Sequence, residues 1–216
     1  TINEKEKIKT IKIIIDYQAK SFNGLFSDCK CIDYIKFKKF YRNRIYNMSQ
    51  MFKGCSLLQE INFTTFNTDD VTDMRLMFFG CQWLKELDLS KFNTNNVTDM
   101  RGMFSFCTFL EDLNISNFIT NKLTNMGMLF SECQNLREIN LSNFNTDNVT
   151  DISGIFTHCY CLKKINLSNF NTNNVTNMNG LFFGCSSLKE IDLTNFNTSN
   201  VTKVDWMFYG CISLKK

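Results

Sequence analysis

The sequence predicts an α/β solenoid built from about eight 26-residue repeats. Phe recurs at steps of 26 from Phe26 to Phe208, and Cys recurs at the same step from Cys29 to Cys211. A second Phe column runs from Phe40 to Phe196 with the same spacing. No insertion or deletion breaks the period between residues 22 and 216. Such a fixed period is typical of repeat proteins whose units stack on their neighbours.

The first part of each repeat predicts a short strand. In the stretch LKELDLSKFNTNNVTDMRGMFSFC, residues 84–107, Leu87 and Leu89 alternate with the polar residues Glu86, Asp88 and Ser90. An apolar side chain at every second position is typical of a half-buried strand. Because the period never changes, equivalent strands are expected to lie side by side and parallel.

The second part of each repeat predicts a short helix. Its apolar residues recur at helical spacing: Val97, Met100, Met103, Phe104 and Cys107. Asn96 followed by Asp99 resembles a capping box, and Gly80 falls where such a helix would end. Stacked strands lie about 4.8 Å apart, whereas helices are about 10 Å across. We therefore expect strands on a concave face and helices on a convex face.

A single repeat is too small to bury a sufficient core, so the stack must fold as one unit. We expect one continuous solenoid domain over residues 22–216. Residues 1–21 do not match the repeat and are expected to form an N-terminal cap, with IKIII (11–15) as a capping strand. The last repeat contains only part of the 26-residue pattern, which suggests a truncated C-terminus.

The repeat pattern LxxLxLxxFNTxNVTxMxxMFxGCxxL resembles the 26-residue leucine-rich repeat of BspA-like surface proteins. The resemblance covers about residues 22–216, although the first repeat lacks the FNTxNVT segment. It implies a leucine-rich-repeat solenoid that is secreted or displayed at the cell surface. It also implies binding to other macromolecules, often in adhesion.

Outward-pointing strand residues are the candidate binding site for a protein or glycan partner. Solenoids use such faces for partners, although a solvated face without a specific ligand explains the pattern equally well. The site comprises three columns on the expected concave face: Glu60, Glu86, Asp112, Glu138, Lys164 and Glu190; Asn62, Asp88, Asn114, Asn140, Asn166 and Asp192; and Thr64, Ser90, Ser116, Ser142, Ser168 and Thr194. Off-column aromatic residues are candidates for a contact edge: Trp83, Tyr160, Trp206 and Tyr209.

Two other columns favour structural roles. The Cys column falls in the apolar stripe, which favours buried, reduced thiols over a ladder of disulfides. Asn residues equivalent to Asn93 and Thr residues equivalent to Thr98 are expected to hydrogen-bond from repeat to repeat.

The sequence predicts no enzyme, cofactor or metal site. His158 is the only histidine, and no nucleophile–base pair, phosphate loop or metal-ligand spacing is present. The net charge of +3 argues against nucleic acid, and no apolar run is long enough for a transmembrane segment. Two alternatives remain open: a structural component that self-assembles through an open C-terminal rung, and an intracellular interaction scaffold.

Overall fold

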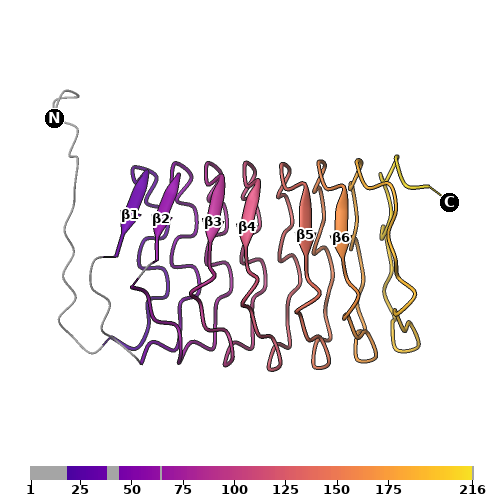
Figure 1. The fold of residues 1–216 in the computed structure, drawn as a ribbon, viewed down its shortest axis with the longest axis horizontal. Helices are drawn as coiled ribbons and strands as arrows, with labels where there is room; N and C mark the ends of the chain where they lie inside the picture. The colour runs from indigo at the N-terminus through magenta and orange to yellow at the C-terminus, as the bar shows by residue number, and fades with distance from the viewer. Residues whose placement is uncertain (1–18, 38–43, 64, 216) are drawn as a thin grey trace.

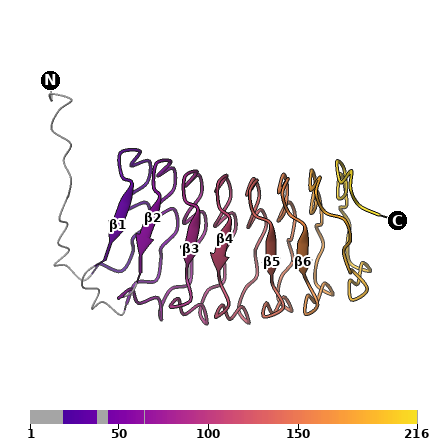
Figure 2. The same ribbon diagram turned by 45° about the horizontal axis from the view of Figure 1, so that its top comes forward.

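The computed structural model describes residues 19–37, 44–63 and 65–215. The chain winds into rungs that follow one another in an almost straight row, as Figures 1 and 2 show from two directions. Most of the expected cap at residues 1–21, including IKIII, lies outside the described residues. One continuous domain over residues 22–216 therefore stays a prediction.

Six three-residue strands lie on one side of the stack (Figure 1). They are β1 (Tyr34–Lys36), β2 (Glu60–Asn62), β3 (Glu86–Asp88), β4 (Asp112–Asn114), β5 (Glu138–Asn140) and β6 (Lys164–Asn166). They form the parallel pairs β1–β2, β3–β4 and β5–β6, and each residue faces the one 26 positions later. The expected parallel strands are confirmed, but the described residues contain six of them, short of the expected eight repeats.

A second ladder joins the rungs away from the strands. Parallel bridges connect residues at steps of 26: Ser21, Asn47, Asp73, Asp99, Asn125, Asp151, Asn177 and Lys203. This ladder is continuous over these rungs, whereas the strands join the rungs only in pairs.

The expected helices are wrong, because the described residues contain no helix. The apolar segment from Met100 to Cys107 instead forms successive turns, in which the Met103 N–H donates to Met100 O (3.1 Å) and the Cys107 N–H to Phe104 O (3.2 Å). Gly102 and Phe106 have φ of 59° and 60°. This left-handed conformation cannot continue a right-handed helix.

Hydrogen bonds to the next rung replace those of a helix. The N–H groups of Gly102, Phe104 and Phe106 donate to carbonyl oxygens of the following rung at 2.9, 3.0 and 2.8 Å. Asp99 accepts from the Arg101 N–H at 2.9 Å, so it caps a turn and no helix. Because no helix layer widens one side of the stack, the rungs can keep the same spacing on both sides. The fold is therefore a stack of rungs made of short parallel strands and turns, without the expected convex layer of helices.

Stacked phenylalanine rings form the centre of the core. The column from Phe26 to Phe208 places successive ring centroids between 5.4 and 5.9 Å apart, with the planes within 14° of parallel. Phe78, Phe104 and Phe130 are fully buried and lie one over the next, as the repeat predicted. Each ring fills space that the neighbouring rungs leave open, so no rung completes its core alone.

Polar groups inside the stack are satisfied from rung to rung. The buried Thr94 hydroxyl donates to Ile119 O and accepts from the Ile119 N–H, both at 2.8 Å. Thr98 Oγ1 donates to Thr72 O at 3.2 Å, and Asn93 Nδ2 donates to Asp69 Oδ1 at 2.8 Å. The expected structural role of the Asn and Thr columns is confirmed at these positions.

We predict that Phe104→Ala destabilises the protein by about 3–5 kcal/mol, because it removes a fully buried ring stacked on both sides. Urea unfolding followed by circular dichroism measures the loss. Ile119→Ala is the control, because Ile119 is 45% exposed and lies outside the core. Equal losses for the two variants would contradict a core built on the ring column.

We predict that Gly184→Ala lowers stability by about 1–3 kcal/mol, because φ is +75° and a Cβ there would lie 2.6 Å from His158 Cδ2. Gly127→Ala is the matched control, since φ at Gly127 is not positive and the nearest atom lies at 3.6 Å. Thermal unfolding of both variants tests this. A Gly127 variant as unstable as the Gly184 variant would contradict the turn geometry described here.

Candidate interaction surface

The predicted binding columns lie outward on the strand face. Thr64 lies outside the described residues, and Asn62, Ser90 and Ser142 are partly buried. The other predicted site residues are exposed: Glu60, Glu86, Asp88, Asp112, Asn114, Ser116, Glu138, Asn140, Lys164, Asn166, Ser168, Glu190, Asp192 and Thr194. The structure therefore brings the described part of the candidate site onto one surface, which we call the strand face.

In the column from Asn62 to Asp192, which we call the second column, most side chains are hydrogen-bonded within their own rung. Asp88 Oδ1 accepts the Ser90 N–H at 2.9 Å, and Asp192 Oδ1 accepts the Thr194 N–H and hydroxyl at 2.9 and 2.7 Å. These hydrogen bonds stabilise the carboxylates and lower the pKa of both Asp88 and Asp192. Side-chain bonds to the backbone two residues on are typical of Asx turns. The same contact recurs in the equivalent pairs Asn114–Ser116, Asn140–Ser142 and Asn166–Ser168.

The column that runs from Glu60 to Glu190, which we call the first column, is the part of the strand face most available to a partner. Across β5–β6, Glu138 forms an ion pair with Lys164 at 3.4 Å, with both side chains well exposed. Across β3–β4, Glu86 instead faces Asp112, and neither forms an ion pair among the described residues. Charge is therefore compensated at the Glu138–Lys164 pair and not at the Glu86–Asp112 pair.

A shallow depression of about 890 Å³ lies over β4, β5 and β6. Its lining includes Glu138, Asn140, Lys164, Asn166 and Glu190, all of them predicted site residues. The lining contains no aromatic side chain. Aromatic anchors for a partner must therefore come from outside this depression.

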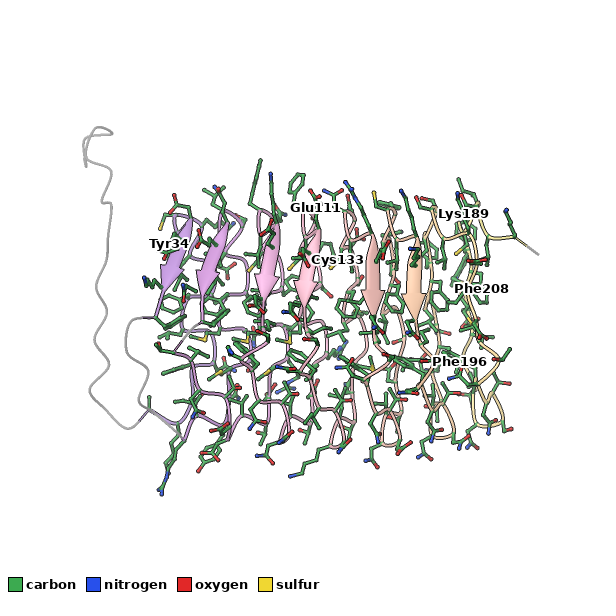
Figure 3. All side chains as sticks on the ribbon, in the orientation of Figure 1. Tyr34, Glu111, Cys133, Lys189, Phe196 and Phe208 are labelled. Carbon is green, nitrogen blue, oxygen red and sulfur yellow. The ribbon has the colours of Figure 1, made fainter. Side chains whose placement is uncertain are left out.

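Exposed aromatic residues occur in the segments that precede the strands. Glu111 and Lys189, which lie in two of these segments, are at one edge of the stack in Figure 3. Trp83 and Phe109 are partly exposed, with ring centroids 5.0 Å apart, and Phe79 lies 5.1 Å from the exposed Phe106. The sequence identified Trp83 as an off-column aromatic but missed Phe109. The signal was available, because Phe109 follows Trp83 by one period.

His158 contacts Glu132 on the preceding rung, with 2.5 Å between Nδ1 and Oε1. Its ring also packs against Tyr160 and Phe183 at centroid distances of 5.4 and 4.9 Å. Among the described residues, no group of three or more His, Cys, Asp or Glu side chains is arranged to hold a metal ion. That part of the chain also has no helix of the length and apolarity needed to cross a membrane.

The cysteines among the described residues are all free, as predicted. The thiol of Cys107 donates to Phe78 O at 3.2 Å, and the other column members from Cys55 to Cys211 make the equivalent contact. Burial raises the pKa of Cys107 and Cys185 to about 12 and that of Cys55 to about 11. Thiolates are the reactive form of cysteine, so these thiols are inert groups of the core.

The rungs, the parallel strands and the ring column define a repeat protein of the leucine-rich-repeat type. The chain belongs to the family described as "Mycoplasma protein of unknown function, DUF285", which matches residues 20–139 and 125–216. No curated protein matches the chain significantly.

Solved bacterial leucine-rich-repeat proteins share the fold. A leucine-rich cell surface protein of Faecalibacterium prausnitzii is 21% identical, with a TM-score of 0.59 over 86% of this chain and 47% of that protein. A leucine-rich-repeat protein of Eubacterium ventriosum is also 21% identical, with a TM-score of 0.54 over 86% of this chain and 44% of that one. The chain thus spans about half the length of these two proteins. The predicted resemblance to BspA-like repeats is confirmed for the fold.

We predict that iodoacetamide labels Cys31 in the native protein at pH 8, whereas Cys107 and Cys133 react only after unfolding. Alkaline conditions add a second readout. A raised pKa in the folded state means that stability is full below the ordinary thiol pKa of 9.0 and falls as the pH rises toward about 12. Mass spectrometry of labelled peptides and unfolding curves between pH 8 and 11 measure the two effects. Cys31→Ser is the control and leaves the alkaline loss unchanged.

Proposed function

We propose that this chain is a non-enzymatic interaction module that binds a protein partner through its strand face and the adjoining aromatic edge. The observation that carries the proposal is the placement of the exposed first column beside exposed aromatic pairs on one side of the stack. Aromatic residues are enriched at the centres of protein interfaces, and charged residues around them give orientation.

Rigid presentation supports this proposal. The bridge ladder joins each rung to the next, and the strands join the rungs in pairs, so the side chains on the surface are held at fixed spacing. A preorganised surface loses little conformational entropy when a partner binds. A broad and open depression suits a macromolecule better than an enclosed small ligand.

We further propose that the protein acts at the cell surface in adhesion. This follows from the resemblance to BspA-like repeats and from the description of the F. prausnitzii protein as a cell surface protein. A glycan partner and an intracellular scaffold role are alternatives that the binding experiment below separates. Self-association through the C-terminal rung stays a prediction, which concentration-dependent sedimentation tests.

We predict that Glu60→Lys with Glu86→Lys abolishes binding to an array of purified extracellular proteins. Both side chains are exposed in the first column. A partner that complements their negative charge is repelled by the two lysines. The matched control Asp70→Lys, Asn95→Lys, Asn121→Lys makes an equal change in net charge in the turns between the strands and the bridge ladder.

The array carries purified proteins and neutral oligosaccharides side by side. Binding to a protein that the strand-face variant loses and the control keeps supports the proposal. Equal loss in both variants, or binding confined to oligosaccharides, would contradict it. Circular dichroism before each measurement shows that the variants are folded.

A further inference from the structure

An apolar row crosses three successive rungs beside the strand face. Leu57, Trp83 and Phe109 occupy one position of the repeat and are 47%, 45% and 36% exposed. The Trp83 N–H donates to Ser56 O at 3.3 Å and the Phe109 N–H donates to Gln82 O at 3.1 Å, so the backbone fixes the row. Asn135 takes this position on the next rung and ends the row.

Two carboxylates adjoin the row on the same rungs. Glu86 and Asp112 follow Trp83 and Phe109 by three residues, and they face each other across β3–β4. Like charges directly opposite in a sheet are destabilising. The β5–β6 pair avoids this with the Glu138–Lys164 ion pair, but no cation of the described residues forms an ion pair with Glu86 or Asp112. The pair is therefore suited to accept a cation from outside.

A second aromatic pair on the same rungs bears a conformational cost. Phe106 has φ of 60° at a position of the repeat that is glycine in four other rungs and Asp28, Glu132 or His158 in the remaining three, all with positive φ. A bulky residue in this conformation costs roughly 1–3 kcal/mol. Its ring is nevertheless 42% exposed and packs only partly, against Phe79. The Phe79–Phe106 pair adds exposed aromatic surface on the same two rungs as Trp83 and Phe109.

We propose that the acidic–aromatic edge formed by Leu57, Trp83, Glu86, Phe109 and Asp112 binds a polypeptide segment in which Arg or Lys alternates with apolar residues. This inference rests on the proposed function and names the chemistry of the partner. A guanidinium group pairs with the two carboxylates and stacks on the Trp83 ring, while the apolar residues cover Leu57 and Phe109. A neutral sugar offers rings to the aromatic residues but no charge to the carboxylates.

Intrinsic fluorescence tests the proposal directly. Trp206→Phe leaves Trp83 as the single tryptophan, and this variant is titrated with the capped peptide GRLRLRG. We expect a saturable change in Trp83 emission that weakens with added salt. The capped peptides GELELEG and GQLQLQG are expected to bind at least about tenfold more weakly, because neither supplies a cation.

Variants of the edge locate the binding. Glu86→Gln with Asp112→Asn in the Trp206→Phe background is expected to weaken GRLRLRG binding about tenfold. Asn95→Lys with Asn121→Lys, which makes the same change in net charge in turns away from the strand face, is expected to leave the affinity unchanged. All the substituted side chains are exposed, and thermal unfolding shows that each variant is folded.

Three results would overturn the inference: equal affinity for GELELEG, no effect of the Glu86 and Asp112 substitutions, or displacement of GRLRLRG by a neutral oligosaccharide. Its failure is distinguishable from failure of the proposed function. If the array binding described above is lost in the Glu60 and Glu86 reversal but survives Glu86→Gln with Asp112→Asn, the strand face binds proteins by other chemistry. If array binding is absent throughout while GRLRLRG binds, the proposed function fails instead.

Discussion

Hydrogen bonds between successive rungs are the constraint on which the rest of the structure depends. They occur at the strands, at the bridge ladder and along the turn segment, where alternate N–H groups from Met100 to Phe106 donate to the next rung. Because every backbone group inside the stack needs a partner, this arrangement fixes the 26-residue period. An insertion of one residue would displace all three sets of bonds at once.

The same constraint sets the composition of the core and of the surface. Residues one period apart lie next to each other, so a Phe at one position stacks on the next Phe, and a buried Thr or Cys bonds to the backbone of a neighbouring rung. On the outside, the same rule places like side chains together. Glu86 faces Asp112 and Trp83 contacts Phe109 for this reason. Function is therefore expected where a rung departs from the repeat.

Most of the fold could be predicted from the repeat, but the helices could not be excluded. The spacing of Val97, Met100, Met103 and Cys107 suits a helix face, yet it also suits turns that direct every third side chain inward. A glycine in the middle of the segment, such as Gly102, was the available signal against a helix. Leu76 and Met128 adopt the same left-handed conformation without being glycine, which periodicity cannot reveal.

The sequence by itself determined the period, the parallel strands, the buried columns and the outward position of Glu86 and its equivalents, because these follow from which side chains avoid water. Only the tertiary structure decided which partners the backbone N–H and carbonyl groups bond to. It also decided which outward side chains already form hydrogen bonds or ion pairs. Asp88 bonds to Ser90 within its own turn, while Glu86 three rungs into the stack meets a second carboxylate without a cation. Such pairings depend on distances across rungs, and those distances exist only once the chain is wound.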